Sequence, residues 1–242
     1  MFKKILICFV VFTLMLSVLS CFDNSGSTKM PSPQKEDTKF DDKIIACLGD
    51  SITYTLAHGY TEYYPQAVER ILGLYNSVNL GVAGSTVTNC TNRSPMCLRY
   101  TQIPNNADII TVMGGINDLY ANIPLGTETD TDTSTFYGAL NTIAKGIKDN
   151  YPKAYVVFCT VLPSVKYQDA DDLNGANYSI VDMNNAIKTV ATNHGFDVCD
   201  LYTLCGAFNE ANYDTDGVHP TQAFLSSNLA PKLADFIKEN YH

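Results

Sequence analysis

The chain has 242 residues, 25 acidic against 16 basic side chains, and a formal net charge of −9. With 45% apolar and only 17% charged residues, it is too apolar for a disordered chain and fits a folded globular protein. Because phosphate binding needs a clustered Lys/Arg surface, this acidic balance argues against nucleic acid as a partner. It argues equally against a polybasic membrane-binding patch.

The first twenty residues have the pattern of an export signal. Lys3 and Lys4 precede an almost unbroken apolar run over residues 5–19, which is shorter than the roughly 20 residues that a membrane-spanning helix needs. Residues 18–21, Val-Leu-Ser-Cys, resemble a bacterial lipobox, whose cysteine becomes the lipidated first residue of the mature protein. The sequence therefore predicts an exported protein that Cys21 anchors to the bacterial cell envelope. An ordinary signal peptide, and hence a secreted protein, is the alternative.

Residues 21–42 predict a flexible tether behind that anchor. They consist mostly of Ser, Thr, Pro, Gly, Asp and Lys, and their few sizeable apolar side chains are Phe22, Met30 and Phe40. Such a segment cannot bury enough apolar surface to offset the entropy lost on ordering. The expected organisation is a signal peptide over 1–20, the lipidated cysteine with its tether over 21–42, and one folded domain over 43–242.

From residue 43 onward, apolar strand-like runs alternate with amphipathic helical patterns. Strands are predicted over residues 44–48, 77–80, 108–113, 154–162 and 196–201. Helices are predicted over residues 62–72, 134–150, 178–194 and 221–240. Continuous apolar strands between amphipathic helices are typical of a parallel sheet that is covered on both faces. The expected fold is therefore α/β, a three-layer α/β/α sandwich around a parallel five-stranded sheet.

The cysteines fit an exported domain better than a metal site. Of eight cysteines, Cys8 leaves with the signal and Cys21 carries the lipid, so six remain in an oxidising setting. Two pairs are close enough in sequence for a short local disulfide, Cys90 with Cys97 and Cys199 with Cys205. Cys47 and Cys159 lie in apolar strand-like runs and are expected to be buried thiols. Because the chain has no Cys-x-x-Cys and only four histidines, no zinc site is predicted.

Polar motifs gather where the predicted strands end. They are Gly49-Asp50-Ser51, Gly84-Ser85-Thr86, Gly115-Ile116-Asn117-Asp118 and, before the last helix, Asp216-Gly217-Val218-His219-Pro220. Ligands of parallel α/β sheets bind at the carboxyl ends of the strands. A serine, an asparagine and an Asp-x-x-His at one such edge supply a nucleophile, a base, an orienting acid and oxyanion donors. These are the groups that acyl transfer needs.

With these four motifs in this order, the chain from residue 44 onward resembles the SGNH, or GDSL, hydrolase superfamily. Its members are esterases and lipases with a flavodoxin-like three-layer fold. The resemblance implies that Ser51 is the nucleophile, with Asp216 as the acid and His219 as the base. Gly217 is expected to permit the turn between acid and base, and Pro220 to begin the helix behind it. The resemblance implies no metal and no organic cofactor.

The same resemblance implies an oxyanion hole made by the backbone amides of Ser51 and Gly84 and the side-chain amide of Asn117. Gly81 competes with Gly84, which we prefer because the family glycine typically lies five residues after the strand asparagine, here Asn79. Each motif also has a structural reading as a turn or a helix cap, including Asn117 as a cap. Two further acidic residues are expected to bond nearby backbone outside the site, Asp50 and Asp118.

The motifs Gly-Asp-Ser-Ile-Thr and Asp-Gly-Val-His-Pro look most like the carbohydrate-esterase and small-ester branches of the superfamily. Polar segments over residues 120–135 and 164–177 are candidates to line the site, and no apolar lid for long acyl chains is evident. Several tyrosines near the motifs are candidates to stack on sugars: Tyr54, Tyr60, Tyr63, Tyr64, Tyr120 and Tyr213. The expected function is therefore carbohydrate O-acetylester hydrolysis through an acyl-enzyme.

Two alternatives remain. The first is hydrolysis of short-chain esters or lysophospholipids. The second is a surface lipoprotein that binds glycans without turnover. A nucleotide binder is disfavoured because the chain has neither Gly-x-Gly-x-x-Gly nor a Gly-Lys-Ser/Thr loop. The expected partner is a small-molecule or glycan ester, with membrane contact only through the lipid.

Overall fold

The computed structural model describes residues 38–54, 59–90 and 93–242. The predicted signal peptide, Cys21 and most of the tether therefore lie outside the described residues. Within the described ranges, no helix is long and apolar enough to cross a membrane.

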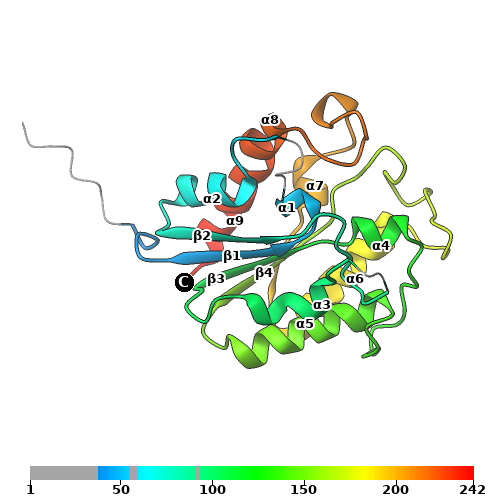
Figure 1. Ribbon diagram of the computed structural model, residues 1–242, viewed down its shortest axis with the longest axis horizontal. Helices are drawn as coiled ribbons and strands as arrows, with labels where there is room; N and C mark the ends of the chain where they lie inside the picture. Colours follow the sequence, from blue (N-terminus) through cyan, green and yellow to red (C-terminus); the bar gives the residue numbers. More distant parts are fainter. Residues whose placement is uncertain (1–37, 55–58, 91–92) are drawn as a thin grey trace, which may run out of the picture. The chain divides into compact units, whose positions relative to one another are not determined.

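The centre of the domain is a five-stranded sheet in which every neighbouring pair of strands is parallel (Figure 1). The strands are β1 (Ile44–Gly49), β2 (Asn76–Gly81), β3 (Ile109–Met113), β4 (Tyr155–Cys159) and β5 (Asp197–Cys199), in the order β2-β1-β3-β4-β5. This order is that of flavodoxin-like sheets, so the predicted fold class is confirmed. The chain leaves β1 toward β2 on one side and reaches β3 on the other. The carboxyl ends of β1 and β3 therefore flank the crevice where ligands of such sheets bind.

Helices cover both faces of the sheet, which confirms the three-layer prediction (Figure 1). On one face lie α2 (Tyr64–Leu72) and α9 (Ala230–Asn240); on the other lie α3 (Met96–Arg99), α5 (Phe136–Asn150) and α6 (Ile180–His194). Residues 45–48 of β1 are completely buried between the two layers. The central strand is therefore apolar on both faces, as its sequence predicts.

The strand β4 ends at Cys159, three residues before the end of the apolar run over residues 154–162 that predicted it. Val161 is buried, yet its N–H donates to Oδ1 of Asn184 (2.8 Å) and its carbonyl accepts from Nδ2 of the same side chain (3.1 Å). The side chain of Asn184, which belongs to α6, thus makes the two backbone hydrogen bonds that a neighbouring strand would otherwise make with Val161. The run stays apolar because it is buried, not because it is extended sheet.

The C-terminal helix predicted over residues 221–240 runs without interruption from Gln222 to Asn240, but it is not α-helical throughout. The structure has α8 (Gln222–Phe224), a π-helix over Leu225–Leu229 and then α9. Pro231 lies in the first turn of α9 and has no N–H to donate to the preceding turn, which accounts for the change of helix type.

The structure contains no disulfide among the described cysteines, so neither local pair is bonded. Sγ of Cys90 donates to the carbonyl of Ser134 (3.1 Å), while Cys97 is buried in α3. Cys47 and Cys159 are buried thiols, as predicted, and burial raises the pKa of Cys47 to about 12.

Candidate active site

Ser51 lies at the carboxyl end of β1, as the first residue of the short helix α1 (Ser51–Tyr54). The helix packs closely on the strand ends. A Cβ added to Gly49 would lie 2.8 Å from the carbonyl oxygen of Met113, and one added to Gly81 would lie 2.3 Å from the backbone nitrogen of Tyr54. Both positions therefore require glycine for close approach of the backbone. The consequence is a serine fixed at the edge of the crevice and still 8% exposed.

A continuous hydrogen-bond chain joins Ser51 to two residues far along the sequence. Oγ of Ser51 lies 2.8 Å from Nε2 of His219, and Nδ1 of His219 lies 2.6 Å from Oδ2 of Asp216. Oδ1 of Asp216 accepts the backbone N–H groups of Val218 (2.8 Å) and His219 (3.0 Å). In this hydrogen-bond chain Ser51 has the place of a nucleophile, His219 that of its base and Asp216 that of the acid that orients the base.

The electrostatics fix the direction of these hydrogen bonds. Burial raises the pKa of Asp216, but its hydrogen bonds from the backbone and from His219 outweigh burial, so the pKa lies below its ordinary value. An ionised carboxylate can only accept, so Nδ1 of His219 carries a proton, and in the neutral imidazole Nε2 then presents a lone pair to Ser51. The imidazole is thus in the tautomer that can receive the serine proton.

The loop that carries the acid and the base is a tight turn. Gly217 has φ +65°, which confirms its predicted role, and its N–H donates to the carbonyl of Asp214 (2.9 Å). Pro220 does not begin a helix. It forms an antiparallel bridge with Tyr213, and α8 begins at Gln222, two residues later. The hydroxyl of Thr221 caps that helix by accepting from the N–H of Phe224 (3.3 Å).

Gly84 and Asn117 come together beside Ser51's strand. The carbonyl of Val82 accepts the N–H of Ser85 (3.1 Å), which closes a turn with Gly84 at φ +69°. Asn117 lies in α4 (Ile116–Tyr120), directly after β3, and its Nδ2 donates to the carbonyl of Ser85 (2.9 Å). Its side chain caps no helix.

The two competing glycines differ in what their amides do. The N–H of Gly81 donates to Oδ1 of Asn79 (2.9 Å), whereas the amides of Gly84 and Ser51 have no acceptor among the described residues. One N–H of the Asn117 side chain is likewise left over after its bond to Ser85. This difference favours Gly84 over Gly81 as a donor to a bound oxyanion.

Arg99 holds this edge together, and sequence reasoning missed it. The side chain is only 5% exposed and donates to the carbonyls of Gly49 (2.9 Å), Leu80 (2.7 Å) and Ser94 (2.7 Å) and to Oγ of Ser85 (3.0 Å). It therefore ties the ends of β1 and β2 to the turn that contains Gly84. Burial lowers the pKa of Arg99 below its ordinary value. Nothing in the local sequence separates this residue from an ordinary surface arginine.

The two remaining acidic residues bond backbone groups, as predicted. Oδ1 of Asp50 accepts the N–H of Ile52 (2.9 Å). Asp118 accepts the N–H groups of Val87 (2.8 Å) and Thr88 (3.0 Å) and the hydroxyl of Thr88 (2.7 Å), so it fixes the segment after the Gly84 turn. Both carboxyls are buried, and burial raises the pKa of each to about 6.

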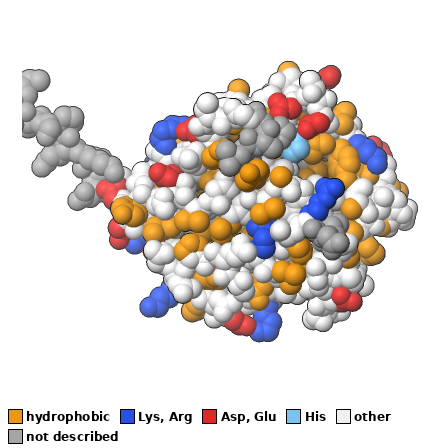
Figure 2. All heavy atoms as spheres, in the orientation of Figure 1, with side chains coloured by type: hydrophobic (Ala, Val, Ile, Leu, Met, Phe, Trp, Pro, Cys, Tyr) orange, Lys and Arg blue, Asp and Glu red, His pale blue; other side chains and the backbone are white. Residues whose placement is uncertain are grey.

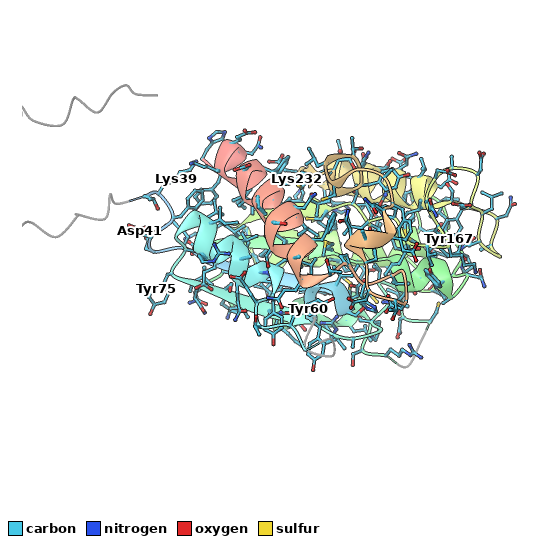
Figure 3. The ribbon with its side chains drawn as sticks, turned by 90° about the horizontal axis from the view of Figure 1, so that it is seen from above. Lys39, Asp41, Tyr60, Tyr75, Tyr167 and Lys232 are labelled. Atoms are coloured by element: carbon cyan, nitrogen blue, oxygen red, sulfur yellow. The ribbon has the colours of Figure 1, made fainter. Side chains whose placement is uncertain are left out.

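Among the described residues, the expected polar segment over residues 164–177 contacts the catalytic turn directly, and the segment over residues 120–135 adjoins it through Tyr120. The N–H of Val165 donates to the carbonyl of Gly217 (2.8 Å), which places the start of segment 164–177 against that turn. Next to it, the ring of Tyr120 meets that of Tyr167 edge to face, with centroids 5.0 Å apart. Nζ of Lys166 lies over both rings, at 5.6 and 4.8 Å from their centroids. Figure 3 shows Tyr167 at the opposite end of the sheet from Tyr75.

Three of the six tyrosines proposed as sugar platforms are buried or hydrogen-bonded away from a substrate. Tyr64 is fully buried and Tyr213 is 7% exposed. The hydroxyl of Tyr60 donates to Oδ2 of Asp214 (2.7 Å) and to the carbonyl of Pro220 (2.9 Å), two residues that flank the catalytic turn, and so stabilises that turn. Tyr120, whose hydroxyl pairs with Oγ of Ser164 (3.1 Å), remains half-buried beside the turn.

A parallel α/β sheet with a Ser-His-Asp hydrogen-bond chain at its carboxyl edge defines a serine hydrolase. The chain belongs to the GDSL-like lipase/acylhydrolase family, whose model matches residues 47–224. It is accordingly a serine ester hydrolase of the SGNH/GDSL superfamily, as the motifs predicted.

Solved structures show the same fold. A protein from Lactobacillus plantarum is 31% identical, with a TM-score of 0.73, over 84% of this chain and 99% of that one. A GDSL-like lipase from Bacteroides thetaiotaomicron is 20% identical, with a TM-score of 0.58, over 81% and 88% of the two chains. A lipase/acylhydrolase from Enterococcus faecalis is 18% identical, with a TM-score of 0.59, over 81% and 96%. No curated protein matches the sequence.

Proposed function

We propose that the protein is a carbohydrate O-acetylesterase that works through an acetyl-enzyme on Ser51. The observation that carries the proposal is the hydrogen-bond chain from Asp216 through His219 to Oγ of Ser51. As Oγ attacks the ester carbonyl, Nε2 of His219 takes its proton, and Asp216 stabilises the imidazolium that results.

The developing oxyanion accepts hydrogen bonds from the backbone N–H groups of Ser51 and Gly84 and from the side-chain amide of Asn117. These groups are arranged before substrate binds, because Arg99 and Asp118 hold the Gly84 turn by hydrogen bonds. His219 then returns the proton to the leaving alcohol. Water attacks the acetyl-enzyme with the same histidine as base, which releases acetate and restores the serine.

The surroundings of the catalytic turn support a sugar as the alcohol. The hydroxyl and half-buried ring of Tyr120 and the amine of Lys166 lie together beside it. Hydroxyls and amines are the partners that sugar hydroxyl groups require, and an aromatic ring is a surface on which a sugar face can pack.

We also propose that Cys21 carries a lipid that anchors the enzyme to the cell envelope, with residues 22–42 as the tether. The proposal rests on the lipobox-like residues 18–21 and on the polar composition that follows them. Two or more acyl chains would give stable attachment where one would be marginal.

A substrate screen tests the proposed activity. The purified protein should release acetate from acetylated xylan and from mono-O-acetyl sugars, and kcat/KM on p-nitrophenyl esters should fall as the acyl chain lengthens. Preference for long-chain esters or lysophosphatidylcholine would contradict the sugar substrate and identify the enzyme as a lipid ester hydrolase. Binding of glycan without release of acetate, from protein that also leaves p-nitrophenyl acetate intact, would instead identify a non-catalytic lipoprotein.

A further inference from the structure

Arg93 lies over the glycine that we place in the oxyanion hole. A Cβ added to Gly84 would lie 3.0 Å from Nη1 of Arg93, 3.4 Å from its Cδ and 3.8 Å from its Cζ. The absence of a side chain at residue 84 therefore leaves the space that the guanidinium occupies. The Arg93 side chain is exposed, so the guanidinium faces solvent at the rim of the site.

The chain has three arginines, and the other two have partners. Nε and Nη2 of Arg70 donate to the carboxylate of Glu62 (3.0 and 3.2 Å), and Arg99 is buried among three carbonyls and a hydroxyl. Among the residues that the structure describes, none forms an ion pair or a hydrogen bond with the guanidinium of Arg93. Figure 2 shows Lys and Arg side chains on the face that also carries a histidine and a group of acidic side chains.

An unpaired guanidinium offers a planar fork of N–H donors that matches a carboxylate or a phosphate. The protein carries a net charge of −9, yet the positive charge of Arg93 at the rim of the active site has no ion-pair partner among the described residues. This charge is therefore available to a bound anion. An acetyl group has no anionic substituent, so the anion must belong to the alcohol part of the ester.

We propose that Arg93 is a specificity residue that binds an anionic group on the sugar, a carboxylate or a phosphate, next to the acetylated hydroxyl. This inference rests on the proposed O-acetylesterase function and narrows its substrate class to acidic sugars. Because Arg93 lies at the rim and the proton transfers belong to His219, its contribution is to substrate binding and should appear mainly in KM.

Matched substrates test the inference through released acetate. A mono-O-acetyl uronic acid is compared with the uronamide of the same sugar, which has the same ring and acetyl group without the charge. In the second arm, acetate release from a mono-O-acetyl sugar phosphate is compared with release from the same acetylated sugar without the phosphate. The enzymes are the wild type, Arg93→Gln, Arg93→Lys and, as a matched control, Arg70→Gln, which removes the same charge from an arginine already paired with Glu62.

At low salt, the wild type should prefer one of the two anions over its neutral partner by roughly tenfold in kcat/KM, and the preferred arm identifies the carboxylate or the phosphate. Arg93→Gln should lose that preference by a rise in KM, with the neutral sugars hydrolysed within about twofold of wild type. Arg93→Lys should keep part of it, and Arg70→Gln all of it.

Equal rates on charged and neutral sugars in the wild type, or a preference retained in Arg93→Gln, would overturn the inference and leave the O-acetylesterase proposal standing. An equal fall in kcat on all substrates in Arg93→Gln would also overturn it, because Arg93 would then act on the oxyanion. If p-nitrophenyl acetate is hydrolysed but none of the four acetylated sugars is, the proposed function itself fails, and this inference fails with it.

Discussion

Asn117 is the residue at which a catalytic and a structural role separate most clearly. Its side chain donates to the carbonyl of Ser85 and caps no helix. If its second N–H donates to the oxyanion, Asn117→Ala should lower kcat by about 10²–10³ and leave KM nearly unchanged, because that hydrogen bond strengthens in the transition state. Steady-state kinetics beside a melting curve measures both effects. A lowered Tm with unchanged kcat would make the residue purely structural.

Asp50 should make the stability of the fold depend on pH. Burial raises its pKa from 3.8 to about 6, so the folded state binds the proton more tightly than the unfolded state. The stabilising effect of that proton is present at low pH and is lost as the pH rises through about 6. Asp50→Asn stays neutral and can still accept the N–H of Ile52. Relative to wild type, its free energy of unfolding should rise by about 2–3 kcal/mol from pH 4 to pH 7.

Urea unfolding at the two pH values measures this difference. A gap between Asp50→Asn and wild type that stays constant from pH 4 to pH 7 would show that Asp50 titrates alike in the folded and unfolded states.

At the scale of elements, Arg99 links the ends of β1 and β2 to the Gly84 turn through four hydrogen bonds. Arg99→Lys keeps the charge but cannot reach all four acceptors, so buried carbonyls would lose their partners. We expect a loss of about 3 kcal/mol in unfolding free energy and a fall in kcat, since the turn that carries an oxyanion donor is released. Urea unfolding and kinetics with p-nitrophenyl acetate test this. Lowered stability with wild-type kcat would show that the turn holds its position without Arg99.

The sequence predicted the elements well where burial alone decides them. The apolar runs located all five strands, and helix periodicity located α2, α5 and α6 to within two residues. The departures arise where one side chain decides the backbone: Asn184 ends β4 by bonding Val161, and Pro231 accounts for the π-helical segment within the last helix. Pro231 was visible in the sequence, but the contact from Asn184 depends on tertiary packing.

The same distinction holds for the site. Motif order was sufficient to select Ser51 and His219, because both follow from the carboxyl-edge rule and the family resemblance. The five-residue spacing from Asn79 already favoured Gly84 over Gly81, and the hydrogen bond from the N–H of Gly81 to Asn79, which only the structure shows, supports that choice. Arg99 and Arg93 had no signal in the sequence, because their roles come from contacts with distant loops.

At the scale of the whole molecule, the lipobox-like residues predict where the enzyme works. Cys21→Ala should move the active protein from the membrane fraction to the soluble one, because the acyl chains that we propose as its anchor are then absent. Cys8→Ala, which removes a thiol from the predicted signal instead, is the matched control and should leave the protein in the membrane fraction. Fractionation followed by an esterase assay measures this. A Cys21→Ala protein that stays with the membrane would exclude this anchor.

The account depends most directly on Ser51 as the nucleophile. A fluorophosphonate reacts covalently with an activated serine, so intact-mass analysis should show one adduct on the wild type and none on Ser51→Ala, which should also lack esterase activity. Ser94→Ala, which changes an exposed hydroxyl and retains the carbonyl that accepts from Arg99, should be labelled like wild type. Equal labelling of Ser51→Ala and wild type would contradict the acyl-enzyme mechanism and the site built around it.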